Sequence, residues 1–188
     1  LDSTNKPINQ WAALYQLRSI KNPLNFSLPP VTVAVDVQNP LLGPDGCTRV
    51  YGPQKGFNET DISPAEDALK TLARTWENQM GEAADQLPGA GAAGGLGFGL
   101  YCFLKADLQS GFALFARTVR LTEKLTEADI VITGEGGMDR QTVMGKGVGE
   151  LAKLARQHDC RCLAFAGTVD DVAALKVILN SAEAWLRL

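Results

Sequence analysis

The loop that follows Thr133 combines consecutive glycines with charged and hydroxyl side chains, in the order TGEGGMDRQTVMGKG. It follows a predicted strand and precedes a predicted helix, which is where α/β proteins usually bind their ligands. Consecutive backbone amides in such a turn form an anion-binding concavity, and Lys146 adds a positive charge suited to a phosphate or a carboxylate. Glu135 and Asp139 carry oxygens that could hold Mg²⁺ or orient a hydroxyl group. The same spacing also fits a surface loop with solvated charges, so that alternative stays open.

This loop does not match the Walker A phosphate-binding motif. Arg140 stands where that motif requires its first glycine, and Gly147 follows the Gly-Lys pair where serine or threonine belongs. Any phosphate would therefore be bound by a different arrangement of amides and lysine.

Asp36 lies near the end of an apolar, β-branched segment, VTVAVDV at residues 31–37, which predicts a buried strand running into a turn at Asn39. A carboxylate that emerges from such a strand is costly unless it is paired or functional. Further along, Gln54 and Lys55 stand among glycines in YGPQKG, and the lysine suits an anion. An aspartate satisfied by turn amides explains Asp36 equally well.

A second glycine cluster, PGAGAAGGLGFG at residues 88–99, contains the pattern G-x-G-x-x-G from Gly89 to Gly94. A dinucleotide-binding fingerprint must follow a strand, however, and residues 83–87 are predicted as helix or loop. NAD binding is therefore disfavoured. A helix start that packs tightly on a neighbour, or one that offers amides to an anion, explains the cluster better, and the sequence does not separate these two.

Predicted helices and strands alternate along the chain. Strands are expected at residues 31–37, 130–133 and 163–166, and helices at 11–20, 96–104 and 148–157, over the amphipathic segment 110–127, from a capping box at Ser63, and from Asp170 to the C-terminus. This alternation predicts an α/β fold with mainly parallel strands.

The composition excludes several functional classes. A net charge of −3 gives no reason to expect a nucleic-acid partner, and the apolar stretch Leu96–Leu104 is too short to span a bilayer. Four cysteines are too few and too scattered for a disulfide framework, which favours a reduced, cytoplasmic protein. Cys160, Cys162 and His158 fit no common zinc spacing, so buried free thiols are expected instead.

Five segments, in one order, resemble the glycerate kinase family found mainly in bacteria. They read VAVDVQNPLLGP, YGPQKG, PGAGAAGGLGFG, ADIVITGEGGMDRQTVMGKG and LAFAGTV, and they extend from about Val31 to Thr168. The resemblance implies a two-lobed α/β enzyme with mainly parallel sheets. It would transfer the γ-phosphoryl group of ATP, with Mg²⁺, to D-glycerate, and the expected product is 2-phosphoglycerate. A non-catalytic anion- or nucleotide-binding fragment or paralogue of the same fold is the alternative, and an NAD-dependent oxidoreductase is a weaker one.

The resemblance also implies how the chain divides. Residues 1–127 would belong to one α/β lobe with substrate and anion loops, and residues 128–188 to the C-terminal portion of a second, Rossmann-like lobe. Family members begin with further motifs that this sequence lacks. We therefore expect the C-terminal half to two thirds of the enzyme, with the N-terminal part of the family fold absent. No membrane partner is expected, and a homo-oligomer stays open.

The family motifs carry over onto a defined set of residues. We expect catalytic roles for Asp36, Glu135 and Asp139, the last two also as ligands of Mg²⁺. Lysines at both glycine-rich loops would neutralise phosphate or carboxylate charge. The residues expected to bind substrate or phosphate are Asn39, Gln54, Lys55, Gly89, Gly91, Gly94, Gly134, Gln141, Thr142 and Lys146.

Overall fold

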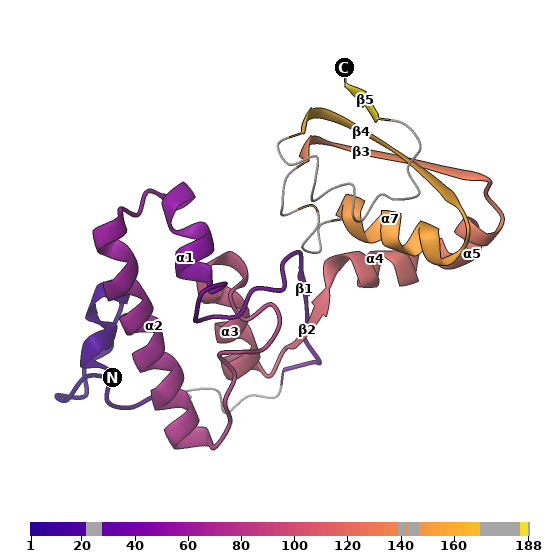
Figure 1. Cartoon of the computed structure of the whole chain (residues 1–188). Helices are drawn as coiled ribbons and strands as arrows, with labels where there is room; N and C mark the ends of the chain where they lie inside the picture. The colour runs from indigo at the N-terminus through magenta and orange to yellow at the C-terminus, as the bar shows by residue number, and fades with distance from the viewer. Residues whose placement is uncertain (22–27, 139–141, 143–146, 170–184, 188) are drawn as a thin grey trace. The chain divides into compact units, whose positions relative to one another are not determined.

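The computed structural model describes residues 1–21, 28–138, 142, 147–169 and 185–187, and the chain divides into two compact units, Leu1–Gln109 and Ser110–Leu188 (Figure 1). The division comes earlier than the expected boundary at 127–128. The reason is that the amphipathic segment packs with the second unit, where Leu125 is buried in the core and Leu121 contacts it. The expected α/β class, with parallel strands, is confirmed.

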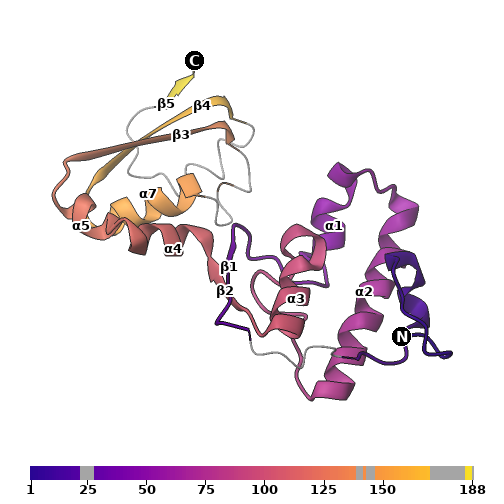
Figure 2. The same cartoon turned by 180° about the vertical axis from the view of Figure 1, so that it is seen from behind.

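The first unit is mainly helical. Its elements are η1 (Trp11–Gln16), β1 (Thr32–Val35), α1 (Cys47–Tyr51), η2 (Pro53–Lys55), α2 (Glu59–Met80), α3 (Ala92–Leu104) and β2 (Asp107–Ser110). The two short strands pair with each other, and η1 lies against α2 in both views (Figures 1 and 2). The core lies between α1, α2 and α3, and its largest buried side chains include Leu41, Trp76 and Phe98.

Helix α2 begins one turn before the predicted start at Ser63. The Asp61 carboxylate accepts a hydrogen bond from the Asn58 backbone N–H at 2.9 Å, which caps the helix at that point. Pro64 lies inside the helix near its N-terminal end, where its missing N–H removes a hydrogen bond from the second turn. The capping box predicted from Ser63 is therefore wrong. The helix faces the core with Ala73 and Trp76, which are buried there.

Helix α3 has an irregular first turn. Ala93, Gly94 and Gly95 have left-handed φ values of 53°, 78° and 99°, so regular helix begins only at Leu96. Deeper in the cluster the backbone packs very closely, since a Cβ on Gly97 would lie 2.1 Å from a backbone carbonyl oxygen. Tight packing therefore explains part of the second glycine cluster.

The second unit contains α4 (Gly111–Thr118), α5 (Leu121–Thr126), β3 (Ile130–Met138), α7 (Gly147–Gln157), β4 (Arg161–Val169) and β5 (Trp185–Arg187). The strands form a parallel sheet in the order β3-β4-β5, with Ile132 opposite Leu163 and Glu135 opposite Ala166. Helix α7 packs against β3 and β4 (Figure 2). Cys162 and two alanines of β4, together with Cys160 just before the strand, share one buried cluster with residues of this helix.

Two sequence expectations change in the second unit. The strand predicted at 130–133 continues through the glycines to Met138, because it stays paired with β4 along its length. The helix predicted from Asp170 to the C-terminus is wrong at its end, where residues 185–187 pair as a strand with β4. Residues 170–184 lie outside the described residues. No helix in the described parts of the chain is both long and apolar enough to cross a membrane.

Candidate functional site: an anion pocket and a carboxylate loop

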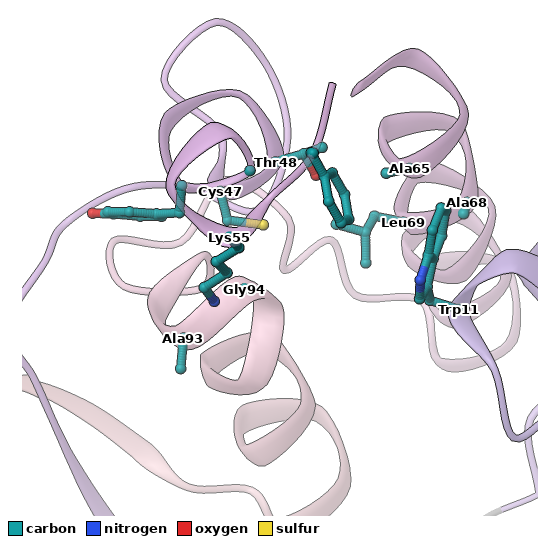
Figure 3. Close-up of a pocket in the computed structure, with 12 residues that line it drawn as sticks. Trp11, Cys47, Thr48, Lys55, Ala65, Ala68, Leu69, Ala93 and Gly94 are labelled. Carbon is teal, nitrogen blue, oxygen red and sulfur yellow. The ribbon is translucent and has the colours of Figure 1, made fainter. Parts of the chain in front are cut away.

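A pocket of about 210 Å³ lies in the first unit, between η1, α1, η2, α2 and the first turn of α3 (Figure 3). It brings together residues from both glycine clusters of this unit. Gly52 and Lys55 belong to the segment YGPQKG, which is the first glycine cluster, and Ala93 and Gly94 belong to the second cluster at residues 88–99. The chain thus joins two loops that the sequence could only describe separately.

Lys55 is the charged residue among those that line this pocket. It ends η2, and the left-handed Gly56 (φ 90°) turns the chain immediately after it. Its side chain points toward Gly94, where an added Cβ would lie 3.2 Å from Nζ (Figure 3). Within the described residues this ammonium has no hydrogen-bond or ion-pair partner. An ammonium group without a protein partner is available to a bound anion.

The other walls of the pocket are largely apolar. Trp11 and Phe57 form a ring pair with centroids 5.6 Å apart, and Leu69 with two alanines of α2 continues the wall. Cys47 adds a buried thiol that donates to the Leu41 carbonyl at 3.3 Å. Burial raises the pKa of the Cys47 thiol, and the nearby Glu66 carboxylate raises it further, so the thiol acts as apolar lining.

Asn39 connects the two glycine clusters from behind the pocket. Its Oδ1 accepts from the Tyr51 hydroxyl at 2.7 Å, and its Nδ2 donates to the Asp45 carbonyl at 2.8 Å. Its backbone carbonyl accepts from the Gly91 N–H at 2.9 Å. Asn39 is 7% exposed, and both of its side-chain polar atoms have protein partners. The expected substrate contact of Asn39 therefore stays a prediction, beside this architectural role.

The remaining predicted residues of the first unit fall into two groups. Asp36 and Gln54 are exposed and do not line the pocket. Gly89 and Gly91 serve close packing, since added Cβ atoms would lie 2.8 Å from a Val35 methyl group and 2.2 Å from a backbone oxygen. Of the three glycines predicted in the second cluster, only Gly94 faces the pocket.

Glu135 is the predicted catalytic residue that the structure describes in the second unit. It lies on β3, is half-buried, and accepts a 2.5 Å hydrogen bond from the Thr142 hydroxyl. Thr142 is 1% exposed, so it reaches Glu135 from inside the protein. Gly134 packs against β4, since a Cβ there would lie 2.6 Å from the Phe165 carbonyl oxygen. Three further predicted residues lie outside the described residues: Asp139, Gln141 and Lys146.

The fit to Mg²⁺ rests on Glu135. Magnesium in nucleotide sites typically takes one or two carboxylates together with phosphate oxygens and water. Glu135 meets the minimum of one carboxylate, and its second oxygen accepts no hydrogen bond from the described residues. Among the described residues no group of three or more histidine, cysteine, aspartate or glutamate side chains gathers around one point. The described residues therefore supply one carboxylate toward a magnesium ion, and Asp139, the second predicted ligand, lies outside them.

The dinucleotide alternative does not fit the structure. Helix α2 and an irregular loop, rather than a strand, precede Gly89, so the G-x-G-x-x-G pattern lacks the context that binds a pyrophosphate.

The expected burial of Cys160 and Cys162 as free thiols is confirmed, because these two residues are 2% and 3% exposed.

Sequence reasoning missed the apolar wall of the pocket. Trp11 lies in a weakly patterned N-terminal segment, and Phe57 follows a glycine in a loop. Neither position carries a periodic signal, because their meeting depends on how η1 packs against α2. The sequence signal available at Trp11 and Phe57 was that each is an aromatic residue in an otherwise polar segment.

The parallel sheet, the helices packed against it and the glycine-lined pocket with its lysine define an α/β protein with a pocket that an anion could enter. The sequence model of the glycerate kinase family matches residues 1–182. The chain therefore belongs to the glycerate kinase family.

Individual relatives agree with this assignment. A glycerate kinase of Halalkalibacterium halodurans is 44% identical over 73% of this chain and 36% of its own length. A glycerate 2-kinase of Escherichia coli is 37% identical over 75% of this chain and 37% of its own length. A crystal structure described as a glycerate kinase 2 of Salmonella typhimurium LT2 superposes with a TM-score of 0.67 at 32% identity, over 95% of this chain and 52% of that one. The chain thus spans little more than a third of the length of the curated relatives it matches.

Proposed function

We propose that this chain takes part in the ATP-dependent phosphorylation of D-glycerate, with 2-phosphoglycerate as the product and Mg²⁺ as the metal. Family membership and the names of the relatives support the reaction. The structural observation that carries the proposal is the unpartnered Lys55 ammonium beside Gly94, at the meeting point of two family motifs. The reactants are small molecules, in keeping with the net charge of −3 and a cytoplasmic setting.

Phosphoryl transfer requires little covalent help from a protein. A glycerate hydroxyl oxygen forms a bond to the γ-phosphorus, the bond from that phosphorus to the ADP oxygen breaks, and the hydroxyl proton leaves to a carboxylate or to water. The protein has to align these atoms and stabilise the charge that spreads over the phosphoryl oxygens. In this proposal, Lys55 neutralises phosphate or carboxylate charge and Asp36 orients the glycerate hydroxyl.

Glu135 has a different task in the proposed reaction. It would hold Mg²⁺, which when bound to nucleotide phosphates neutralises their charge. Thr142 fixes the orientation of this carboxylate through its hydroxyl group. Asp139 and Lys146 are proposed to complete the same loop.

A coupled assay of ADP release, with ATP, Mg²⁺ and D-glycerate, tests the proposal on the 188-residue chain. Lys55→Met should lower kcat/KM at least about tenfold, because one cation that stabilises the transferring group is lost. Lys70→Met is the matched control, since Lys70 is an exposed lysine of α2 that does not line the pocket. Binding of ATP without turnover would instead favour the non-catalytic nucleotide-binding alternative. Equal rates in the two variants would contradict the role of Lys55.

A further inference from the structure

We propose that the pocket of the first unit is the adenine-nucleotide subsite, with the base against Trp11 and the phosphates at Lys55. The inference rests on the proposed function and answers a question that the motifs leave open, namely which reactant the paired glycine clusters bind. It assigns the phosphoryl donor, rather than the acceptor, to this pocket.

The lining of the pocket argues against glycerate as its occupant. Glycerate carries one carboxylate and two hydroxyl groups on three carbons, so a site for it needs several polar partners. Among the described lining residues, the Tyr51 hydroxyl already donates to Asn39, and Thr48 is only 6% exposed. Lys55 remains as the one charged contact. Carbon atoms of aromatic, leucine and alanine side chains form most of the rest, which would desolvate the hydroxyl groups without replacing their hydrogen bonds.

The same lining suits a molecule with a flat apolar part and an anionic part. Trp11 lies beside Ala68 and Leu69 at one side of the pocket, whereas Lys55 and Gly94 lie at the other (Figure 3). Trp11 is 47% exposed and is supported from one side by Phe57, so part of its ring surface is accessible for stacking. A purine base can stack on such a ring because it presents a π-face.

The anionic side of the pocket has the features that phosphates require. The Lys55 ammonium is unpartnered in the described residues and supplies positive charge. Ala93 and Gly94 line the pocket in the irregular turn that precedes the regular part of α3 at Leu96, so the positive end of that helix's dipole lies near this side. The absence of a Cβ on Gly94 leaves room beside Nζ, where an added Cβ would come within 3.2 Å. Phosphate oxygens can therefore reach the lysine and the helix start together.

Isothermal titration calorimetry of the 188-residue chain with ADP, adenosine, inorganic triphosphate and D-glycerate tests the inference. Trp11→Ala should weaken ADP binding by roughly tenfold, the effect of losing one base–aromatic stack, and should leave triphosphate binding unchanged. Trp11→Phe should retain most of the ADP affinity. Lys55→Met should weaken ADP and triphosphate binding but not adenosine binding. Tyr15→Ala is the matched control, because Tyr15 is a 66% exposed aromatic of η1 that does not line the pocket.

Two results would overturn the inference. Loss of D-glycerate binding in Trp11→Ala, with ADP binding intact, would make the pocket the acceptor site. Unchanged ADP affinity in both the Trp11 and Lys55 variants would place the nucleotide elsewhere. In either case, continued ADP release from ATP in the coupled assay would leave the proposed function standing. A wild-type chain that binds no ADP and shows no turnover would reject the proposed function and this inference together. Thermal unfolding of each variant shows whether a lost affinity reflects a lost fold.

Discussion

The two units differ in how closely the backbone approaches their glycines, although each unit has both dense and open positions. In the first unit, added Cβ atoms on Gly91 and Gly97 would lie 2.2 Å and 2.1 Å from backbone oxygens, so these glycines let chain segments pack in contact. In the second unit, Gly136 and Gly147 have no neighbouring atom within 4 Å of such a Cβ. Gly134 of the second unit is also packed tightly, with an added Cβ 2.6 Å from the Phe165 carbonyl oxygen, so the closest backbone approaches lie in the first unit but dense packing is not confined to it.

Lys55 also differs in its surroundings from the two ion-paired cations of the second unit. Two cations of the second unit have carboxylate partners, with Lys153 2.7 Å from Glu150 and Arg120 3.6 Å from Glu123. Lys55 of the first unit has none in the described residues. Paired surface charges contribute little to binding, whereas an unpaired one in a pocket is available to a ligand. The first unit thus offers a free cation, and the second unit offers the oriented carboxylate Glu135.

The largest effect is expected from Gly97→Ala. The added methyl group would collide with the Gly89 carbonyl, so the free energy of unfolding should fall by about 3 kcal/mol or more. Gly99→Ala in the same helix meets no neighbour within 4 Å and should be neutral or stabilising by up to about 1 kcal/mol. Urea unfolding of both variants, followed by circular dichroism, measures the difference. Equal stabilities would show that glycine packing does not distinguish the first unit.

A smaller effect is expected from Thr142→Val, which removes the hydroxyl that donates to Glu135. If Glu135 acts in the reaction, kcat should fall about tenfold, or about 1.4 kcal/mol, because its carboxylate loses its fixed orientation. Thr142→Ser keeps the hydroxyl and should restore most of the rate. The coupled assay gives kcat and KM for both variants. A similar loss in the serine variant would indicate that the threonine methyl group, and hence packing, is what matters.

The smallest effect concerns alkaline pH. Burial raises the pKa of Cys102 to about 12, from an ordinary value near 9.0, with a further contribution from the Glu82 carboxylate. Above about pH 9 the unfolded thiol loses its proton while the folded one keeps it, so stability falls as pH rises. Between about pH 8 and about pH 9.5 this group should account for less than about 1 kcal/mol.

Cys102→Ala should flatten that part of the pH dependence, whatever its effect on stability at neutral pH. Cys162 of the second unit provides the comparison, because burial also raises the pKa of its thiol, and the neighbouring Cys160 adds to the shift. Urea unfolding in reducing buffer at several pH values gives both slopes. An unchanged slope in Cys102→Ala would show that the thiol titrates with its ordinary pKa.

The sequence predicted the types of the helices and strands better than the residues at which they begin and end. The apolar runs before Asp36 and Thr133 correctly located strands, since β-branched segments favour extended structure wherever they are placed. The start of α2 was wrong because Ser63-Pro64 has the chemistry of a helix start, but Asn58 and Asp61 cap the chain one turn earlier. Two local signals competed, and the helix begins at the earlier one, where Asn58 and Asp61 form the cap.

The residues of the candidate site likewise differ in how well the sequence could predict them. The lysine and glycines of the pocket stand in recognisable loops, so their residue types could be selected from sequence. Trp11 could not, because it reaches the pocket through the contact of η1 with α2, which has no local sequence signal. Asn39 shows a further limit, because its predicted contact with substrate stays a prediction while its side-chain amide is engaged by Tyr51 and Asp45. Sequence identifies a polar residue in a loop but not the partners that fold around it.

The left-handed backbone at the rim of the pocket has a consequence for how relatives can diverge. Non-glycine residues pay about 1 to 2 kcal/mol for this conformation, and Ala93 already does so at φ 53°. Gly94 and Gly95 have φ values of 78° and 99°, so few residues can replace them on this side of the pocket without backbone strain. Changes in ligand preference among homologues should therefore accumulate on the opposite wall, at Trp11 and Phe57, where side chains can vary in size without straining the main chain.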